Sequence, residues 1–330
     1  MPSRRCRAPD VFVIGKALGF DPVAEARRAE AAGYDGVRAI DHYFSAIPPA
    51  QPAAVPHCFV TLTAAAGATE RVLLTQTMVA ATLHHPAEVA QAVATLDRIS
   101  GGRAELGLGT GWLPAEHDGM GIPLGSPRDR VARVLEAAAV CRAMFENDGC
   151  VEFDGKFVRA SSQARWPATP HRPQIMMGAH GPHLLAGAAR VADRIDLVEA
   201  LAGGRPNFTG GHGNTADTLR ARIALAGEAA ADAGHGRRLR IAATVNLLVT
   251  TDHPSRDAAR AALADAANCG LDDLDRELLR VIATEDEVLD RVHALAELGV
   301  DRLHIRPMDE HSQRWLDEAL NTIQEVPCQT

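Results

Sequence analysis

The sequence contains no C-x-x-C pair, no long apolar run and no extended cluster of basic residues. Its six cysteines are irregularly spaced, so they predict reduced thiols rather than a zinc site or a disulfide framework. No apolar stretch approaches the roughly 18 residues that a membrane helix requires. A net charge of -8 and a longest basic run of "SRRCR" argue against a nucleic-acid surface, because phosphate binding needs a basic patch.

Lysine is nearly absent, and almost all basic residues are arginine. A lone arginine in this chain is therefore weak evidence for phosphate recognition. Arg4 and Arg5 resemble a twin-arginine export signal, but the apolar run behind them is short, is interrupted by Lys16 and lacks a clear A-x-A cleavage site. With 46% hydrophobic and 23% charged residues, the sequence predicts a cytoplasmic globular enzyme with no membrane or nucleic-acid partner.

Short apolar runs alternate with longer amphipathic stretches along the chain. The runs predict strands and the stretches predict helices, because their apolar residues repeat at strand and helix periods. The predicted strands are 11–15, 37–40, 71–80, 103–109, 174–178, 194–198, 240–249 and 302–306. The predicted helices are 22–33, 57–67, 86–98, 128–146, 182–192 and 215–233, followed by a helical region from 254 to about 298 that is interrupted near Gly270. A hairpin with its turn at Asp154-Gly155 is predicted as an insertion.

Eight strands that alternate with helices predict an α/β fold, a single (β/α)8 TIM barrel over residues 1–330 with loop insertions at its C-terminal face. A doubly wound sheet would more often have about six strands and a glycine fingerprint after the first, where this chain has "GKALGFDP". Barrel active sites lie on the loops that follow the strands, so candidate site residues are sought at the strand ends.

Asp41 and His42 follow the second predicted strand, in "AIDHYF". A histidine at this position can exchange a proton near neutral pH, and an adjacent carboxylate can fix its tautomer or raise its pKa. The alternative is that Asp41 caps the following turn and His42 is a half-exposed loop residue. A second motif, His84-His85 before Pro86, predicts a strand-to-helix turn rather than a metal site, because neighbouring strand residues point to opposite faces.

Three glycine-rich segments follow predicted strands. In "GLGTGW" (107–112) Trp112 replaces the third glycine of a dinucleotide fingerprint, so the segment predicts either close approach of a flat ring or phosphate, or a tight turn. Gly178 and Gly181 precede Pro182 at a helix start, which predicts an anion site unless the segment is a plain turn. The loop 203–217 leads into a helix that Asn214 or Thr215 could cap, and it could order over a ligand or be mobile.

Three longer segments, "EAAGYDGVRAIDHYF", "HHPAEVAQAVATLDRISGGRAELGLGTGW" and "PQIMMGAHGPHLLAGAARVADRIDLV", together resemble the bacterial luciferase-like superfamily of flavin and deazaflavin oxidoreductases. The resemblance is strongest from about Asp21 to Val198. The Asp-His pair and the "GTGW" turn are similar to the coenzyme F420-dependent branch, whose members move a hydride to or from the deazaflavin ring. This resemblance implies that His42 lies beside the reactive ring as the main catalytic candidate, with Asp41 as its orienting partner.

The resemblance also implies further cofactor contacts. A non-prolyl cis peptide bond, with a bulge that backs the flavin ring, is expected near Thr77-Met78. The cofactor phosphate is expected on the loop of Gly178, Ala179, His180 and Gly181. The side chain or ring of the cofactor is expected along Gly109, Thr110 and Gly111.

The chain departs from the sugar-phosphate dehydrogenases of the same branch. They have an acid after the "GTG" turn and another on the first strand, where this chain has Trp112 and Gly15-Lys16. Oxidation of glucose 6-phosphate is therefore not expected. Trp112 is instead expected to form one wall of an apolar or aromatic substrate pocket.

The resemblance implies an F420-dependent oxidoreductase that transfers a hydride between the deazaflavin and a small organic substrate, with His42 supplying or removing the matching proton. One alternative is an FMN-dependent monooxygenase that uses oxygen and needs a flavin reductase as partner. A second is a cofactor-binding barrel without activity. Relatives pair as homodimers, and a homodimer is expected here.

Overall fold

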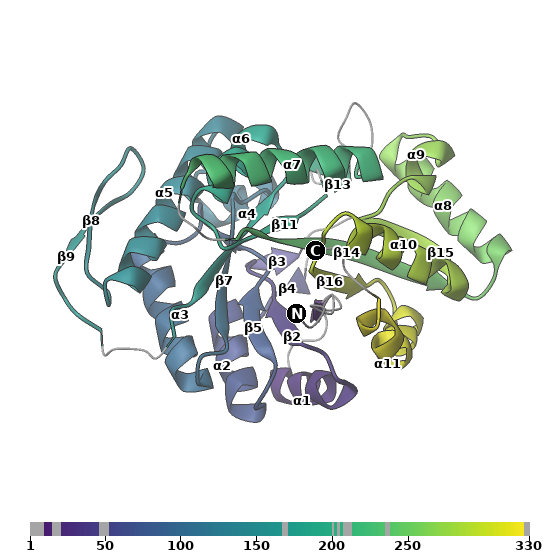
Figure 1. Cartoon of the computed structure of the whole chain (residues 1–330), viewed down its shortest axis with the longest axis horizontal. Coiled ribbons are helices and arrows are strands. Elements are labelled where there is room, and N and C mark those ends of the chain that lie inside the picture. Colours follow the sequence, from purple (N-terminus) through teal and green to yellow (C-terminus); the bar gives the residue numbers. More distant parts are fainter. Residues whose placement is uncertain are drawn as a thin grey trace, which may run out of the picture.

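The computed structural model describes residues 10–14, 21–45, 53–166, 171–199, 201–202, 205–206, 213–234 and 238–326. Within them, eight parallel strands pair in a closed ring in the order β1–β2–β5–β7–β10–β11–β14–β16 and back to β1 (Figure 1). The strands are β1 (Asp10–Ile14), β2 (Gly36–Ala39), β5 (Leu73–Gln76), β7 (Ala104–Gly109), β10 (Gln174–Ala179), β11 (Arg194–Leu197), β14 (Arg240–Thr250) and β16 (Arg302–Pro307). The predicted (β/α)8 barrel is confirmed.

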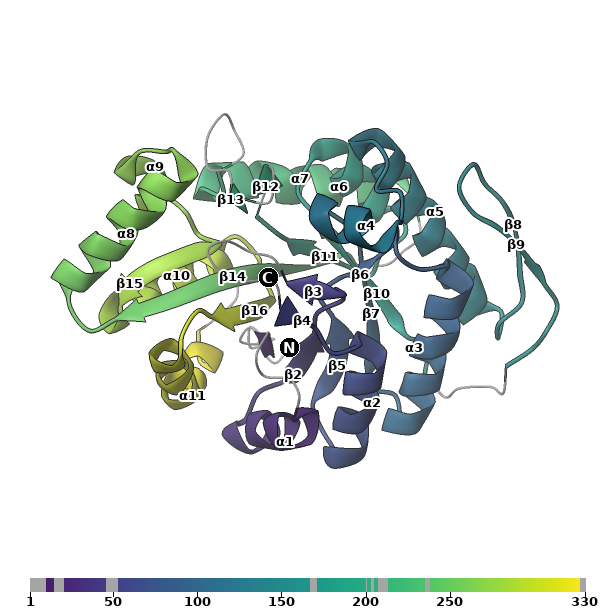
Figure 2. The same ribbon diagram turned by 180° about the vertical axis from the view of Figure 1, so that it is seen from behind.

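Helices surround the ring, and Figure 2 shows the same arrangement from behind. They are α1 (Pro22–Ala32), α2 (Cys58–Ala68), α3 (Pro86–Ser100), α5 (Pro127–Glu146), α6 (Pro182–Ala189), α7 (Ala216–Asp232), α8 (His253–Ala267), α10 (Glu285–Glu297) and α11 (Glu310–Gln324). Local sequence sets their starts: α1 begins at Pro22, and the Asp21 side chain accepts a hydrogen bond from the Ala24 N–H. No helix of the described segments is both long and apolar enough to cross a membrane.

The outward faces of the strands form the apolar core. Val37, Leu74, Leu106, Ile175 and Ile195 are fully buried between the barrel and its helices. Each such side chain contributes about 1.5–3 kcal/mol relative to an exposed one. This burial holds the strand ends, and with them the loops of the mouth, in fixed relative positions.

The inside of the barrel is charged. Arg38 on β2 and His304 on β16 both reach Asp196 on β11, at 3.4 Å and 3.0 Å, and none of the three side chains is exposed. Burial lowers the pKa of Arg38 to about 10, which leaves it cationic at neutral pH. Burial, followed by the charge of Arg38, lowers the pKa of His304 to about 3, so His304 is neutral. Nearer the starts of the strands, Arg302 of β16 donates a hydrogen bond to Glu105 of β7 at 2.7 Å. Most barrels fill this space with branched apolar side chains.

Two regions differ from the predictions. The region 254–298 is not wholly helical: α8 ends before Gly270, α9 (Leu271–Asp275) follows, and β15 (Arg280–Thr284) pairs with the outer half of β14. The β-branched run "RVIAT" explains the strand. The predicted strand 71–80 is divided into β5 and β6 (Val79–Ala80), and a cis peptide bond lies between them at Thr77-Met78. The bond stands where it was predicted.

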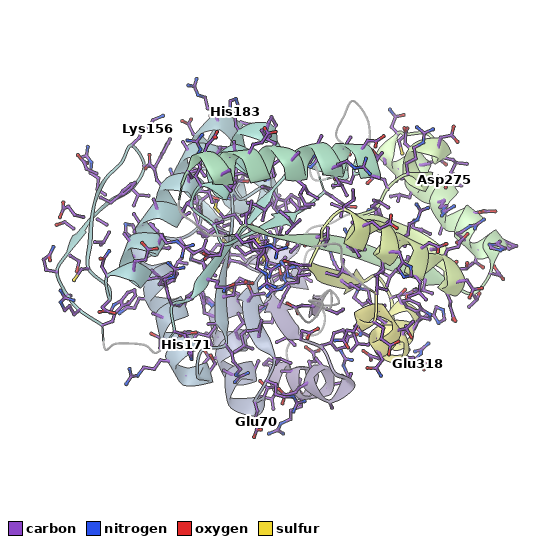
Figure 3. The ribbon with its side chains drawn as sticks, in the orientation of Figure 1. Glu70, Lys156, His171, His183, Asp275 and Glu318 are labelled. Atoms are coloured by element: carbon purple, nitrogen blue, oxygen red, sulfur yellow. The ribbon has the colours of Figure 1, made fainter. Side chains whose placement is uncertain are left out.

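The predicted hairpin is confirmed as β8 (Val151–Asp154) and β9 (Arg159–Ser162). It projects from the barrel, with Lys156 at its tip (Figure 3). Short elements that the sequence did not predict are α4 (Pro114–Met120) and two antiparallel pairs, β3 (Phe44–Ser45) with β4 (Ala53–Ala54) and β12 (Leu201–Ala202) with β13 (Arg205–Pro206). Arg4, Arg5, Gly15, Lys16 and most of the loop 203–212 lie outside the described residues.

Candidate functional site

The predicted site residues follow four neighbouring strands. His42 follows β2, Met78 follows β5, Trp112 follows β7 and His180 follows β10, and these strands are adjacent in the ring. Figure 3 shows that the two ends of the strands face opposite sides of the molecule: Glu70 precedes β5 on one side, and His183 follows β10 on the other. The structure therefore brings the predicted residues to one half of the barrel mouth.

A buried carboxylate holds His42. Glu116 on α4 lies 2.9 Å from Nδ1 of His42, and its second oxygen accepts from the Tyr43 N–H at 2.5 Å. The His42 side chain is 18% exposed and that of Glu116 is 2% exposed. The Trp112 ring meets the His42 ring at 84° with 5.7 Å between centroids. Glu116 and Trp112 thus fix the His42 ring from two sides.

Asp41, predicted to orient His42, has different partners, and that prediction is wrong. Its carboxylate lies 3.0 Å from Nε2 of His84 and accepts from the Ala80 N–H at 2.9 Å, with Cys58 Sγ 3.6 Å away. Burial raises the pKa of Asp41, but His84 and Ala80 outweigh it, so its pKa falls below the usual value. For His84 the effects are reversed: burial lowers its pKa, but the contact with Asp41 outweighs burial, so the pKa of His84 is raised above its usual value. Asp41 therefore joins β2 to the segment after β6.

The His84-His85 motif forms the predicted turn. Pro86 is the first residue of α3, and the His85 ring accepts from the Ala87 N–H at 3.2 Å. Among the residues that the structure describes, no group of three histidine, cysteine, aspartate or glutamate side chains is placed to hold a metal ion.

The Met78 side chain packs closely against two glycines, Gly109 of β7 and Gly178 of β10. A Cβ atom on Gly109 would lie 2.8 Å from the Met78 Cβ, and one on Gly178 would lie 3.1 Å from the Met78 Cγ. Real Cβ atoms are essentially never found as close as the first of these. These two glycines therefore have a packing role beside the cofactor role predicted for them. That cofactor role remains a prediction.

The turn from Thr110 to Trp112 is tightly fixed. Gly111 has φ +73°, and a Cβ there would overlap Thr82 Oγ1. His117 on α4 lies 2.8 Å from the same Thr82 oxygen through Nε2 and 3.0 Å from the Leu113 carbonyl oxygen through Nδ1. These contacts attach α4, and so Glu116, to the strand end.

The start of α6 retains free backbone donors. Gly181 is its N-cap and provides no side-chain acceptor, and the space around its Cα is open. Such a helix start favours an anion. The neighbouring His180 ring is already engaged: Nδ1 lies 3.1 Å from the Val198 carbonyl oxygen and Nε2 lies 3.1 Å from Arg222. The backbone of this loop, rather than the His180 ring, is therefore its available anion-binding part.

A cavity of about 740 Å³ opens at the other end of the barrel. Charged residues from the strand starts line it, among them Asp10, Glu105, Arg240 and Arg302. Barrel chemistry takes place at the carboxyl ends of the strands, so this cavity is separate from the candidate site.

Sequence reasoning missed Glu116, the partner of His42, and it assigned His84 to a turn without predicting its contact with Asp41. Glu116 follows the "GTGW" turn by four residues and is the third residue of an unpredicted helix that begins at Pro114. The dipeptide Leu113-Pro114 was a possible signal of that helix start. No local signal indicated the contact of Glu116 with His42, 74 residues away in the chain.

Comparison with known proteins identifies the family of this chain. A family model described as luciferase-like monooxygenase matches residues 21–276. The F420-dependent glucose-6-phosphate dehydrogenase of Beutenbergia cavernae is 36% identical over 168 residues, which cover 50% of this chain and 48% of that protein. The match thus spans about half the length of that relative.

Two solved structures share the fold. An F420-dependent secondary alcohol dehydrogenase in complex with an F420-acetone adduct has a TM-score of 0.77 and 20% identity, over 97% of this chain and 98% of that chain. The monooxygenase RslO1 from Streptomyces bottropensis has a TM-score of 0.70 and 22% identity, over 95% and 99%. Because the family model covers most of the sequence, the chain belongs to the luciferase-like monooxygenase family.

Proposed function

We propose that this protein is an F420-dependent oxidoreductase that transfers a hydride between the deazaflavin and a small organic substrate. The observation that carries the proposal is the pairing of His42 with Glu116 at the barrel mouth. The Glu116 carboxylate accepts a hydrogen bond from the Nδ1–H of His42, so the unprotonated Nε2 is the nitrogen that can exchange a proton. Nε2 has no hydrogen-bond partner among the described residues.

The residues around His42 fit a bound cofactor. The uncapped start of α6 at Gly181 suits its phosphate. The turn at Thr110 and Gly111 and the cis peptide bond at Thr77-Met78 follow β7 and β5, the two strands between that helix and His42. When bound, coenzyme F420 supplies the carbon that gives or takes the hydride. Ala179 and the ring of His180 belong to the same loop, and we propose that this loop contacts the phosphate through its backbone.

His42 handles the proton that accompanies the hydride. In the oxidation of an alcohol, Nε2 accepts the hydroxyl proton while the substrate carbon loses its hydride, and Glu116 stabilises the imidazolium that forms. In the reverse direction, the protonated ring returns this proton to the carbonyl oxygen. Trp112, edge-on to His42, excludes water and offers an apolar wall to the substrate.

The relatives support the choice of cofactor. Both the Beutenbergia cavernae dehydrogenase and the secondary alcohol dehydrogenase are named as F420-dependent. We do not extend glucose 6-phosphate to this chain, because Trp112 stands where the sugar-phosphate dehydrogenases have an acid. The likeness to the monooxygenase RslO1 keeps an FMN-dependent monooxygenase with a flavin reductase partner as the second candidate.

Cofactor titration tests the proposal. Purified protein is titrated with F420 and separately with FMN, and tryptophan fluorescence is followed. Micromolar quenching by F420 alone, reduced in W112F but retained in W166F, is the expected result. Selective FMN binding with oxygen consumption would favour the monooxygenase, and binding of neither cofactor would favour the barrel without activity.

The proton role of His42 has its own test. H42A should lower turnover about 10²- to 10⁴-fold, the usual range for a lost general acid or base, while F420 affinity changes little. H253A, at an exposed histidine of α8, is the matched control. Equal losses of turnover and affinity in H42A would contradict the catalytic role.

The same family resemblance supports a homodimer in the cytoplasm. Light scattering on the purified protein should give twice the chain mass of 35.1 kDa. A mass of one chain would contradict the dimer.

A further inference from the structure

The proposed cofactor site uses only half of the barrel mouth. The other half is formed by the ends of β11, β14 and β16, with β1 between β16 and β2. Four polar side chains gather there: Glu199 after β11, Asn246 on β14, Arg306 on β16, and Arg280 at the start of β15, which pairs with β14. Their pairing is uneven, and that difference carries an inference about the substrate.

Glu199 is fully used by two of these neighbours. Arg280 donates to both of its oxygens, at 2.8 Å and 2.7 Å, and Asn246 donates to one of them at 2.9 Å. The Glu199 and Arg280 side chains are 8% and 16% exposed. A bidentate pair of this kind is geometrically fixed, so Glu199 is not free to turn toward another cation.

Arg306 lies beside this pair without an acceptor of its own. It occupies the register position opposite Asn246 and has the same inward orientation as Arg302 and His304, which precede it on β16. Arg306 is partly buried, and no described residue accepts a hydrogen bond or forms an ion pair with its guanidinium. Burial lowers its pKa, Arg280 lowers it further, and Glu199 partly opposes them.

The other inward arginines are more deeply buried than Arg306, and each of them has a carboxylate partner. Arg38 has Asp196, Arg302 has Glu105 and Arg194 has Asp301. Removing a guanidinium from water without a partner is unfavourable. Arginine abundance explains exposed arginines, but it does not explain one placed in the mouth without an acceptor.

The charges indicate the missing partner. The charged groups that act on Arg306 among the described residues are Arg280 and Glu199, and the three together carry one net positive charge, which matches one carboxylate. A planar guanidinium also suits a carboxylate geometrically, since it can donate two parallel hydrogen bonds. Resting on the proposed function, we propose that Arg306 binds the carboxylate of the substrate, which is therefore a small organic acid carrying the alcohol or carbonyl group that reacts beside His42. Its apolar part packs against Trp112.

Binding of simple probes tests this site. Hexanoate and its neutral analogue hexanamide are titrated into the protein, with and without F420, by calorimetry. Wild type should bind hexanoate about tenfold or more tightly than hexanamide, the effect of a charge-assisted pair. R306M should remove this preference, and R306K should retain part of it. R314M, at an exposed arginine of α11, should bind as wild type does.

Two outcomes would overturn the assignment: equal binding of the two probes by wild type, or an undiminished preference in R306M. Tighter, Arg306-dependent binding of hexyl phosphate would also overturn it, in favour of a phosphate ligand. Circular dichroism and F420 titration of R306M separate these outcomes from misfolding and from failure of the proposed function. A variant that binds F420 normally but has lost the hexanoate preference supports the carboxylate site.

Discussion

Two histidines of the barrel have nearly the same hydrogen bond in very different surroundings. His304, inside the barrel, has Nδ1 3.0 Å from Asp196, and His42, at the mouth, has Nδ1 2.9 Å from Glu116. His304 is completely buried beside Arg38, whereas the His42 side chain is 18% exposed beside Trp112. A carboxylate partner alone therefore does not identify a catalytic histidine.

The difference lies in access and in the neighbouring cation. His304 cannot meet a substrate, and burial together with Arg38 lowers its pKa to about 3, so it is a neutral hydrogen-bond donor to Asp196. His42 has a carboxylate on one nitrogen and an open position on the other. The interior histidine is placed for stability and the proposed function assigns proton transfer to the mouth histidine, so substitutions at the two sites should separate these roles.

The largest effect is expected inside the barrel. D196N leaves Arg38 buried without its carboxylate, and breaking a buried pair in this way costs about 3–5 kcal/mol of unfolding free energy. Urea unfolding measures the loss. D154N, at the exposed pair with Arg159, should change stability by less than about 1 kcal/mol. If D196N were as stable as wild type, the interior would not depend on its charge pairs.

At the mouth, E116Q should affect turnover and leave the fold intact. A glutamine amide can donate to Nδ1 of His42 and so favour the tautomer whose Nε2 is already protonated. Turnover in the direction of alcohol oxidation should fall about tenfold to hundredfold. D118N, exposed on the same helix, is the control. Wild-type turnover in E116Q would show that His42 acts without this carboxylate.

Between interior and mouth, Met78 depends on the glycines that face it. G109A would place a Cβ 2.8 Å from the Met78 Cβ and should cost about 1–3 kcal/mol of stability, as overpacking usually does. G67A, on the exposed side of α2 with nothing within 4 Å of its added Cβ, should instead stabilise the protein by about 0.5–1 kcal/mol. If M78A failed to recover stability in the G109A background, Met78 would not be the group that requires glycine.

The smallest effect concerns a third histidine, His84, paired with Asp41. Because the pKa of His84 is raised in the folded protein, its contribution to the free energy of unfolding is complete below pH 6.5 and is lost as the pH rises through the folded-state pKa. The lowered pKa of Asp41 means that its contribution is complete above pH 3.8 and is lost as pH falls through the folded value. The pair should thus stabilise the fold most between pH 3.8 and 6.5.

NMR titration of the His84 ring measures this coupling. Its midpoint should lie above 6.5 in wild type and fall in D41N. A wild-type midpoint at or below 6.5 would contradict the pairing with Asp41.

The fold was predictable because its signals are local. Apolar periodicity located all eight barrel strands, and residues such as Pro22 and Pro86 marked helix starts. The strand β15 was missed because "RVIAT" is only five residues long and lies between two helices, where helical periodicity dominates the sequence. The cis bond at Thr77-Met78 was anticipated only through the family resemblance.

The site was predictable in its positions but not in its partners. His42 and Trp112 were identified as strand-end residues, and both lie at the mouth. Asp41 was assigned to His42 because it is adjacent in sequence, yet adjacent side chains at a strand end point in different directions, and Asp41 turns to His84. Such pairings depend on where distant loops meet, which one sequence does not reveal.

The ionic lining of the barrel also affects how stability varies with temperature. Unfolding exposes guanidinium and carboxylate groups such as those of Arg302 and Glu105 where most barrels would expose valine and leucine. Polar exposure lowers the heat capacity of unfolding and apolar exposure raises it. The lining therefore flattens the curve of unfolding free energy against temperature, and the protein loses stability more gradually on both cooling and heating than a barrel with an aliphatic interior.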